Sequence, residues 1–315
     1  MRVGLLCPGQ GSQHPGMGRA LWERFASVRA IFAEASDVLG RDVGRLCFEG
    51  TDAELRATDT TQPLLYVVGY ASWQALREVL DDRIELAVAA GHSLGEYTAL
   101  AVAGALGFAD GLRLVAARGR LMQQAGIEMP GIMLAILGLE LSVVEDLCRR
   151  VTERDERSGV VVVANDNAPG QIVVSGMPNA VERVGELARE HGARRLVPLA
   201  TSGAFHSPLM ESARRELARV IDEITIHRAV CPVIANCSAR AIQEPAEIRV
   251  ELVDQLCGRV RWTESMRRLV DFAPDLLIEL APGRVLSGLV RRIASALRVF
   301  PMEDEETVDV LVQMP

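Results

Sequence analysis

A serine between two glycines is the clearest chemical signal in the sequence. The pattern G-x-S-x-G spans residues 91–95, with Ser93 at its centre; an apolar run, 85–90, precedes it and a segment with helical patterning follows it. Between a strand and a helix this pattern predicts a nucleophile elbow, a strained turn that projects the serine hydroxyl at the positive end of the helix. The alternative is a glycine-rich turn without a chemical role.

A serine hydroxyl needs a base within hydrogen-bond reach before it becomes a good nucleophile. The chain has five histidines. The ring of His92 is expected to point away from the adjacent serine, His14 lies in the first loop, and His191 and His227 lie among charged residues. His206 lies in a loop between a predicted strand and a predicted helix, so it is the candidate base. The alternative is that it serves only as a hydrogen-bonded residue at a helix start.

Main-chain amides are needed to hold the oxyanion of a tetrahedral intermediate. The elbow predicts the amide of Leu94 as one donor. The loop Gly9-Gln10-Gly11, which follows the first predicted strand, is expected to supply the second. A dinucleotide-binding loop is the competing interpretation, but His14 stands where a third glycine would be, and no acidic residue closes a second strand about 20 residues later.

Composition excludes several classes of protein. All 34 basic residues of the 315 are arginine, and without lysine the chain cannot form a Schiff base, a Walker A loop or a Ser-Lys dyad. A net charge of −8 and 4% aromatic residues oppose nucleic-acid binding. The longest apolar stretch, 98–109, is about a dozen residues long, which predicts no membrane span.

The six cysteines are scattered, with no CxxC pair and no histidine at ligand spacing, so we expect no metal site and no disulfide framework. Residues 1–7 are too short an apolar run for a signal peptide and are interpreted as a first strand. We therefore expect a cytoplasmic protein.

Apolar runs alternate with amphipathic segments over most of the chain, which predicts an α/β fold with a parallel sheet. The expected core strands are 2–7, 85–90, 232–236 and 276–280, and the main core helices are 17–39, 63–79, 208–224 and 284–297. Residues 51–54 fit a capping box. The acidic stretch 302–315 is interpreted as a short appendage.

The order of the predicted strands and helices changes in the middle of the chain. Strands are expected at 132–137, 160–164, 171–175 and 195–199, with helices at 142–154 and 179–190. This βαββαβ order is ferredoxin-like. We expect residues 129–199 to form an inserted subdomain, and 1–128 with 200–315 to form the core.

Five segments together resemble the malonyl-CoA:acyl carrier protein transacylase family, which includes the discrete fatty-acid enzymes and the acyltransferases of polyketide synthases. They occur in order at 8–13, 91–96, 118–119, 203–210 and 282–286, and the match runs from about residue 3 to 297. The resemblance implies an α/β-hydrolase-like core with the ferredoxin-like subdomain inserted.

The resemblance also assigns roles to residues. It implies that Ser93 is acylated, that His206 is the base, and that the amides of Gln10 and Leu94 form the oxyanion hole. It further implies that the main-chain carbonyl at Gln255 orients the histidine. Two positions depart from the family pattern: the turn 257–259, which lies beside Gln255, and Ala281, which precedes Pro-Gly further along the chain. Asp254 is expected to be an exposed carboxylate; the alternative is that it serves as the third member of a catalytic triad.

By the same resemblance, Arg118 binds the malonyl carboxylate, a task that suits a planar guanidinium with two parallel donors. Phe205 and Leu94 are similar to the residues of malonyl-selecting members. A methyl group is worth only about 1–3 kcal/mol in such pockets, so larger 2-substituted units stay open.

The implied reaction transfers malonyl from malonyl-CoA, through the Ser93 ester, to the phosphopantetheine thiol of an acyl carrier protein. No bound cofactor, metal, nucleic acid or membrane is expected, and the protein is expected to be a monomer. The alternatives are a polyketide acyltransferase with another acyl unit, an editing hydrolase that clears carrier proteins, and an inactive docking subunit. The sequence does not separate fatty-acid from polyketide synthesis.

Overall fold

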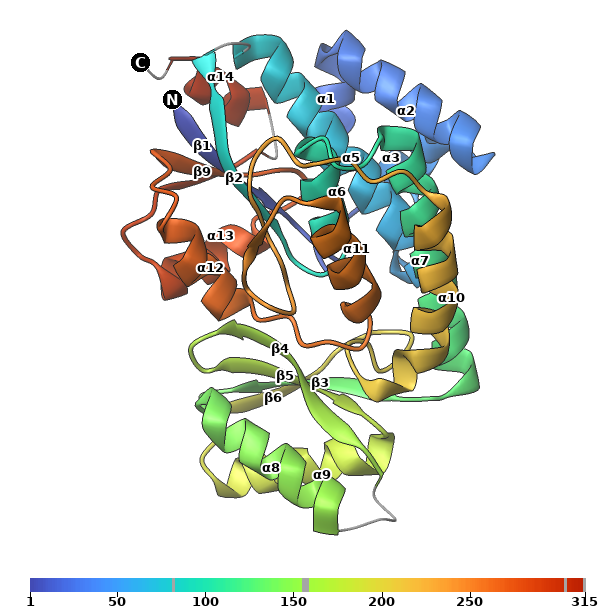
Figure 1. Cartoon of the computed structure of the whole chain (residues 1–315), viewed down its shortest axis with the longest axis vertical. Coiled ribbons are helices and arrows are strands. Elements are labelled where there is room, and N and C mark those ends of the chain that lie inside the picture. Colours follow the sequence, from blue (N-terminus) through green and yellow to red (C-terminus); the bar gives the residue numbers. More distant parts are fainter. Residues whose placement is uncertain (81–82, 155–158, 303–304, 314–315) are drawn as a thin grey trace.

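The computed structural model describes residues 1–80, 83–154, 159–302 and 305–313. Within them lie two sheets, one of six strands and one of four, stacked along the long axis of the molecule (Figure 1). The larger sheet has the order β10-β9-β1-β2-β7-β8. Its strands are β1 (Arg2–Cys7), β2 (Glu85–Gly91), β7 (Val233–Ile234), β8 (Ala241–Ile242), β9 (Leu276–Glu279) and β10 (Val299–Pro301).

All neighbouring strands of the larger sheet are parallel except β7 and β8. The central strands are continuous apolar runs because helices cover both of their faces, as expected for a parallel sheet. The helices of this unit are α1 (Arg19–Arg24), α2 (Ala26–Leu39), α3 (Val43–Glu49), α4 (Asp52–Arg56), α5 (Thr58–Leu80), α6 (Gly95–Val102), α7 (Phe108–Glu128), α10 (Glu211–Glu223), α11 (Pro245–Asp254), α12 (Trp262–Val270), α13 (Val285–Ile293) and α14 (Glu305–Gln313).

The smaller sheet has the order β4-β5-β3-β6 and is antiparallel throughout. Its elements are β3 (Ile132–Leu137), α8 (Leu141–Arg154), β4 (Val161–Ala168), β5 (Gln171–Gly176), α9 (Pro178–Glu190) and β6 (Arg195–Pro198). The βαββαβ order is therefore confirmed, and these elements fall inside 129–199. The exact subdomain bounds stay a prediction.

Several expected elements differ from those observed. The helix expected at 17–39 is broken at Phe25, whose backbone is extended (φ −106°, ψ 128°), into α1 and α2. The long helix begins at Thr58, ahead of Pro63, and the capping box at Thr51 is confirmed. The helix expected from residue 208 starts with a 3₁₀ turn, Pro208–Met210.

The C-terminal stretch is not an appendage. Met302, Val308 and Leu311 are fully buried against the main core. The expectation was wrong because the five acidic residues of the stretch obscure the spacing of the apolar residues that are buried.

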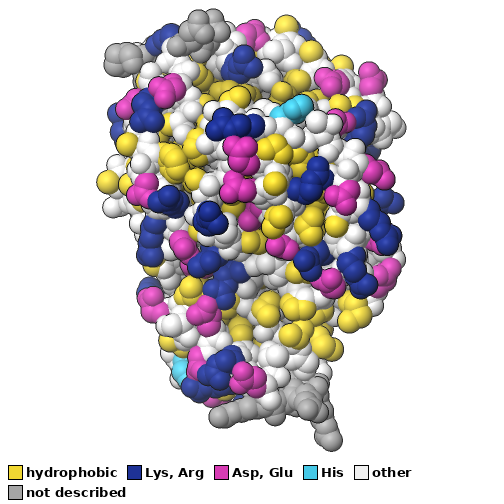
Figure 2. Space-filling model, viewed as in Figure 1, with side chains coloured by type: hydrophobic (Ala, Val, Ile, Leu, Met, Phe, Trp, Pro, Cys, Tyr) yellow, Lys and Arg dark blue, Asp and Glu magenta, His cyan; other side chains and the backbone are white. Residues whose placement is uncertain are grey.

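No helix in the described ranges is long and apolar enough to cross a membrane. Figure 2 shows basic and acidic side chains interspersed over one face of the molecule, with hydrophobic side chains between them. This face therefore carries no extended field of a single sign.

Candidate active site

Ser93 lies at a sharp turn between β2 and α6. Its φ of 51° is in the left-handed region, which is costly for a residue with a side chain. Both flanking glycines are required: a Cβ on Gly91 would lie 1.9 Å from the main chain of Gly95, and a Cβ on Gly95 would lie 1.9 Å from the carbonyl oxygen of Cys7. The turn therefore has the geometry of the predicted nucleophile elbow.

A buried asparagine holds this turn. The Asn236 side chain donates Nδ2–H to the carbonyl oxygen of Gly91, and its Oδ1 accepts from the amide of Ser93, both at 2.7 Å. Asn236 follows β7, 143 residues beyond Ser93, and no spacing in the sequence pointed to it.

His206 lies against the serine. Its Nε2 is 2.8 Å from Ser93 Oγ, and its Nδ1 is 2.9 Å from the carbonyl oxygen of Gln255 and 3.0 Å from that of Gly258. Carbonyl oxygens can only accept, so Nδ1 carries the hydrogen and Nε2 presents a lone pair to the serine. The resemblance implied a contact with the Gln255 carbonyl, which the structure has; the second contact, with the carbonyl of Gly258, was not expected.

Arg118 projects from α7 into the same cluster and is fully buried. Its Nη1 donates to Gln62 Oε1 at 2.7 Å, and its Nη2 donates to Gln255 Oε1 at 2.8 Å and to Ser93 Oγ at 3.1 Å. Because a guanidinium only donates, the serine oxygen accepts from Arg118, and the serine hydroxyl proton is directed to His206.

The electrostatics favour a neutral base. Burial, followed by the nearby positive charge of Arg118, lowers the pKa of His206 to about 3. Burial also lowers the pKa of His92. The imidazole of His206 therefore stays unprotonated near pH 7, as a proton acceptor must.

The cluster opens into a cavity of about 150 Å³ between the two sheets. Among its lining residues are Gln10, Leu94 and Phe205 from the larger unit and Asn165 and Val173 from the smaller one. Six residues predicted for the site line this cavity, and Gln255 accepts a hydrogen bond from one of them, Arg118. The six are Gln10, Ser93, Leu94, Arg118, Phe205 and His206.

Leu94 is the residue before the first turn of α6, and Gln10 lies in the loop after β1. Gly9 lets this loop approach the elbow, because a Cβ there would lie 2.3 Å from the carbonyl oxygen of His92. The two loops whose amides were expected to hold an oxyanion therefore meet at the cavity.

Two other expectations concern neighbouring side chains. His92 Nε2 is 2.7 Å from Asn167 Oδ1 of β4, so its ring points away from the serine hydroxyl but also lines the cavity. Asp254 pairs with Arg214 at 3.0 Å on the surface, so the alternative of a third triad carboxylate is wrong.

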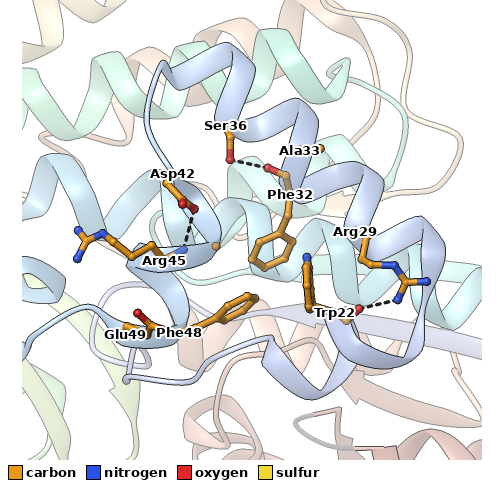
Figure 3. Close-up of a pocket in the computed structure, with 10 residues that line it drawn as sticks. Trp22, Arg29, Phe32, Ala33, Ser36, Asp42, Arg45, Phe48 and Glu49 are labelled. Atoms are coloured by element: carbon orange, nitrogen blue, oxygen red, sulfur yellow. Dashed lines mark hydrogen bonds between the residues drawn. The ribbon is translucent and has the colours of Figure 1, made fainter.

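A larger hollow, about 540 Å³, lies elsewhere, on α1, α2 and α3. Trp22, Phe32 and Phe48 form its aromatic floor, with Arg29 and Arg45 at its rim (Figure 3). It is wide open, and none of the residues predicted from the motifs lines it.

Comparison with known proteins agrees with this geometry. Residues 5–311 match the acyl transferase domain family. Malonyl CoA-acyl carrier protein transacylase of Bacillus subtilis (strain 168) is 40% identical over 312 residues, covering 99% of this chain and 96% of the relative.

Solved structures agree as well. An acyl-carrier-protein S-malonyltransferase from Burkholderia pseudomallei 1710b superposes with a TM-score of 0.93 at 37% identity, over the full length of both chains. A malonyl-transacylase solved in complex with its type II polyketide-synthase acyl-carrier protein gives a TM-score of 0.94 at 38% identity, covering 99% of each chain. The chain therefore belongs to the acyl transferase family, and it is an acyltransferase of the malonyl CoA-acyl carrier protein transacylase type.

Proposed function

We propose that the protein transfers malonyl from malonyl-CoA to the phosphopantetheine thiol of an acyl carrier protein, through an ester on Ser93. The observation that carries the proposal is the contact of Ser93 Oγ with both His206 Nε2 and Arg118 Nη2. His206 accepts the serine proton, and Arg118 supplies a cation within reach of an acyl group on that oxygen.

In the first half-reaction Ser93 Oγ attacks the thioester carbonyl carbon while His206 Nε2 takes the hydroxyl proton. The amides of Gln10 and Leu94 stabilise the oxyanion. The carbon–sulfur bond then breaks, and His206 returns the proton to the sulfur of CoA. The Gln255 and Gly258 carbonyls support this step because they stabilise the imidazolium through Nδ1–H.

The second half-reaction runs in reverse with a new thiol. His206 takes the proton of the phosphopantetheine thiol, the sulfur attacks the ester carbonyl, and the carbon–oxygen bond to Ser93 breaks. The serine oxygen then recovers the proton. No bound cofactor is needed, and all the named groups belong to one chain, which is consistent with a monomer.

Selection of malonyl rests on Arg118. Its oxygen partners, Gln62, Gln255 and Ser93, are all uncharged. A buried guanidinium with neutral partners gains strongly from a carboxylate, which accepts two charge-assisted hydrogen bonds. Acetyl, which has no carboxylate, gains nothing comparable.

The test is a transfer assay with malonyl-CoA and an acyl carrier protein that bears phosphopantetheine, with malonyl-carrier detected by mass. We expect transfer by the wild type and none by Ser93→Ala. Release of free CoA and malonate without malonyl-carrier would instead establish the editing hydrolase. Carriers from fatty-acid and polyketide synthesis, assayed side by side, separate the two pathways by their kcat/KM.

A further inference from the structure

A second buried carboxyl group lies beneath the nucleophile, and the proposed mechanism does not use it. Glu96, in the first turn of α6, is fully buried only three residues after Ser93. Its Oε2 accepts from Nε2 of Gln255, and its Oε1 accepts from the amide of Asn236 at 3.2 Å. It therefore touches two residues that themselves hold Ser93 and Arg118.

These contacts fix which way the Gln255 amide faces. Nε2 of Gln255 donates to Glu96 and, at 2.9 Å, to the carbonyl oxygen of Ser93. With both hydrogens of Nε2 used in this way, Oε1 faces Arg118 and accepts from Nη2. Turned over, the amide would place its NH₂ against a guanidinium that can only donate, and its oxygen against the carbonyl oxygen of Ser93, which can only accept.

We propose that Glu96 is a positioning residue for the site that binds the acyl carboxylate, because it holds Gln255 in the orientation that fixes Arg118. The inference rests on the proposed function, since it concerns how Arg118 meets malonyl. Glu96 does not touch the guanidinium itself; Gln255 connects them, so the effect is one of orientation.

Charge alone would give Glu96 a different role, that of a distant counter-ion to Arg118. Burial, followed by the neighbouring Glu251, raises the pKa of Glu96 well above its usual value, which favours the uncharged carboxyl group. An uncharged carboxyl group acts through hydrogen bonds, so the length of the Glu96 side chain decides whether it holds Gln255 in place.

Two substitutions distinguish the effect of the length of the Glu96 side chain from the effect of its charge. Glu96→Gln keeps the length of the side chain and one oxygen for Gln255, and it cannot ionise. Its NH₂ group then faces the amide of Asn236, which donates to Glu96 in the wild type. Glu96→Asp keeps the carboxyl group but withdraws it by one methylene. Glu251→Gln is a third variant. Glu251 accepts from the amide of Cys237 rather than from Gln255, but it raises the pKa of Glu96, so its replacement changes the ionisation of Glu96 and leaves the contact with Gln255 in place.

The readout is the ratio of Ser93 acylation rates with malonyl-CoA and acetyl-CoA, together with labelling by phenylmethylsulfonyl fluoride, a serine reagent without a carboxylate. We expect Glu96→Asp to lower the ratio about tenfold, the effect of one misplaced hydrogen bond, through a higher KM for malonyl-CoA. Glu96→Gln should keep the ratio within about threefold. Labelling should be unchanged in Glu96→Asp, and Glu251→Gln should match the wild type.

Retention of the ratio by Glu96→Asp with its loss in Glu96→Gln would overturn the inference in favour of a counter-ion. Labelling that falls in parallel with malonyl transfer would also overturn it, since Glu96 would then only support the elbow. A wild type that forms no malonyl ester would refute the proposed function itself, a result independent of any Glu96 variant.

Discussion

Arg118→Ala is the substitution whose effect can be calculated most directly from the site. The guanidinium is fully buried and 3.1 Å from Ser93 Oγ, the oxygen that carries the acyl group in the proposed reaction. If Arg118 binds the acyl carboxylate as proposed, its loss removes two charge-assisted hydrogen bonds, each worth about 1.5–3 kcal/mol. The total of about 3–6 kcal/mol corresponds to a 10²- to 10⁴-fold fall in kcat/KM for malonyl-CoA, at roughly 1.4 kcal/mol per factor of ten.

Acetyl-CoA provides the comparison, because it reacts at the same serine without a carboxylate. We expect its acylation rate to change by less than about tenfold, the part that reflects the lost contact between Arg118 and Ser93. The assay measures kcat/KM for both thioesters by CoA release during single-turnover acylation. Arg120→Ala is the control, since Arg120 is exposed two residues further along the same helix. Equal losses with both thioesters would refute the assignment of Arg118 to the carboxylate.

Three further predictions concern the base, the pocket wall and the turn. Because the pKa of His206 is lowered to about 3, we expect kcat/KM for acylation to stay nearly flat from pH 7.5 to 5, where an ordinary histidine would become protonated and lose activity. Phe205→Ala should raise methylmalonyl transfer relative to malonyl about 5- to 100-fold, measured by competition between the two thioesters. Asn236→Ala leaves the Gly91 carbonyl and the Ser93 amide without their buried partners, so it should cost about 2–6 kcal/mol of unfolding free energy in urea titration.

Each of these has a contrary outcome. A rate that falls tenfold or more between pH 7 and pH 5 would mean that His206 titrates as an exposed histidine does. Unchanged competition in Phe205→Ala would remove that ring from acyl selection. A wild-type urea midpoint in Asn236→Ala would show that the turn holds itself without the side-chain clamp.

Titration of His206 also affects stability. The unfolded histidine binds a proton below about pH 6.5, whereas the folded one does so only near pH 3. The unfolded state therefore binds more protons in this window, and the contribution of His206 destabilises the fold as the pH falls from 6.5 toward 3. Replacement of His206 by glutamine should reduce this loss, as measured by melting temperature against pH.

Local patterns predicted the parts of the fold that depend on neighbours in sequence. The alternation of strands and helices, the βαββαβ insertion and the glycine-flanked turn at Ser93 all follow from residues within about ten positions of one another. The helix break at Phe25 and the three-residue strand β10 could not be predicted from local patterns, since tertiary packing rather than periodicity decides them.

The site itself could be predicted from sequence only in part. The elbow identifies Ser93, and the loop position of His206 made it the candidate base, with a helix-start residue as the alternative. Arg118 reaches the serine from a distant helix, and its role came from the family resemblance. Gln62 and Glu96 were missed. Gln62 follows a polar stretch, 58–61, that gave no signal, whereas Glu96 is a charged residue on a helix whose residues are all buried. That conflict with the apolar pattern was the available signal, since a buried polar group requires a partner.

The central claim is that the acyl group passes through a covalent ester on Ser93. The most direct test is the intact mass of the purified protein after brief exposure to malonyl-CoA without a carrier protein. We predict one malonyl adduct per chain, absent from Ser93→Ala and removed when a carrier protein with phosphopantetheine is added. Transfer to the carrier with no adduct at any time, or an adduct that persists in Ser93→Ala, would contradict the account.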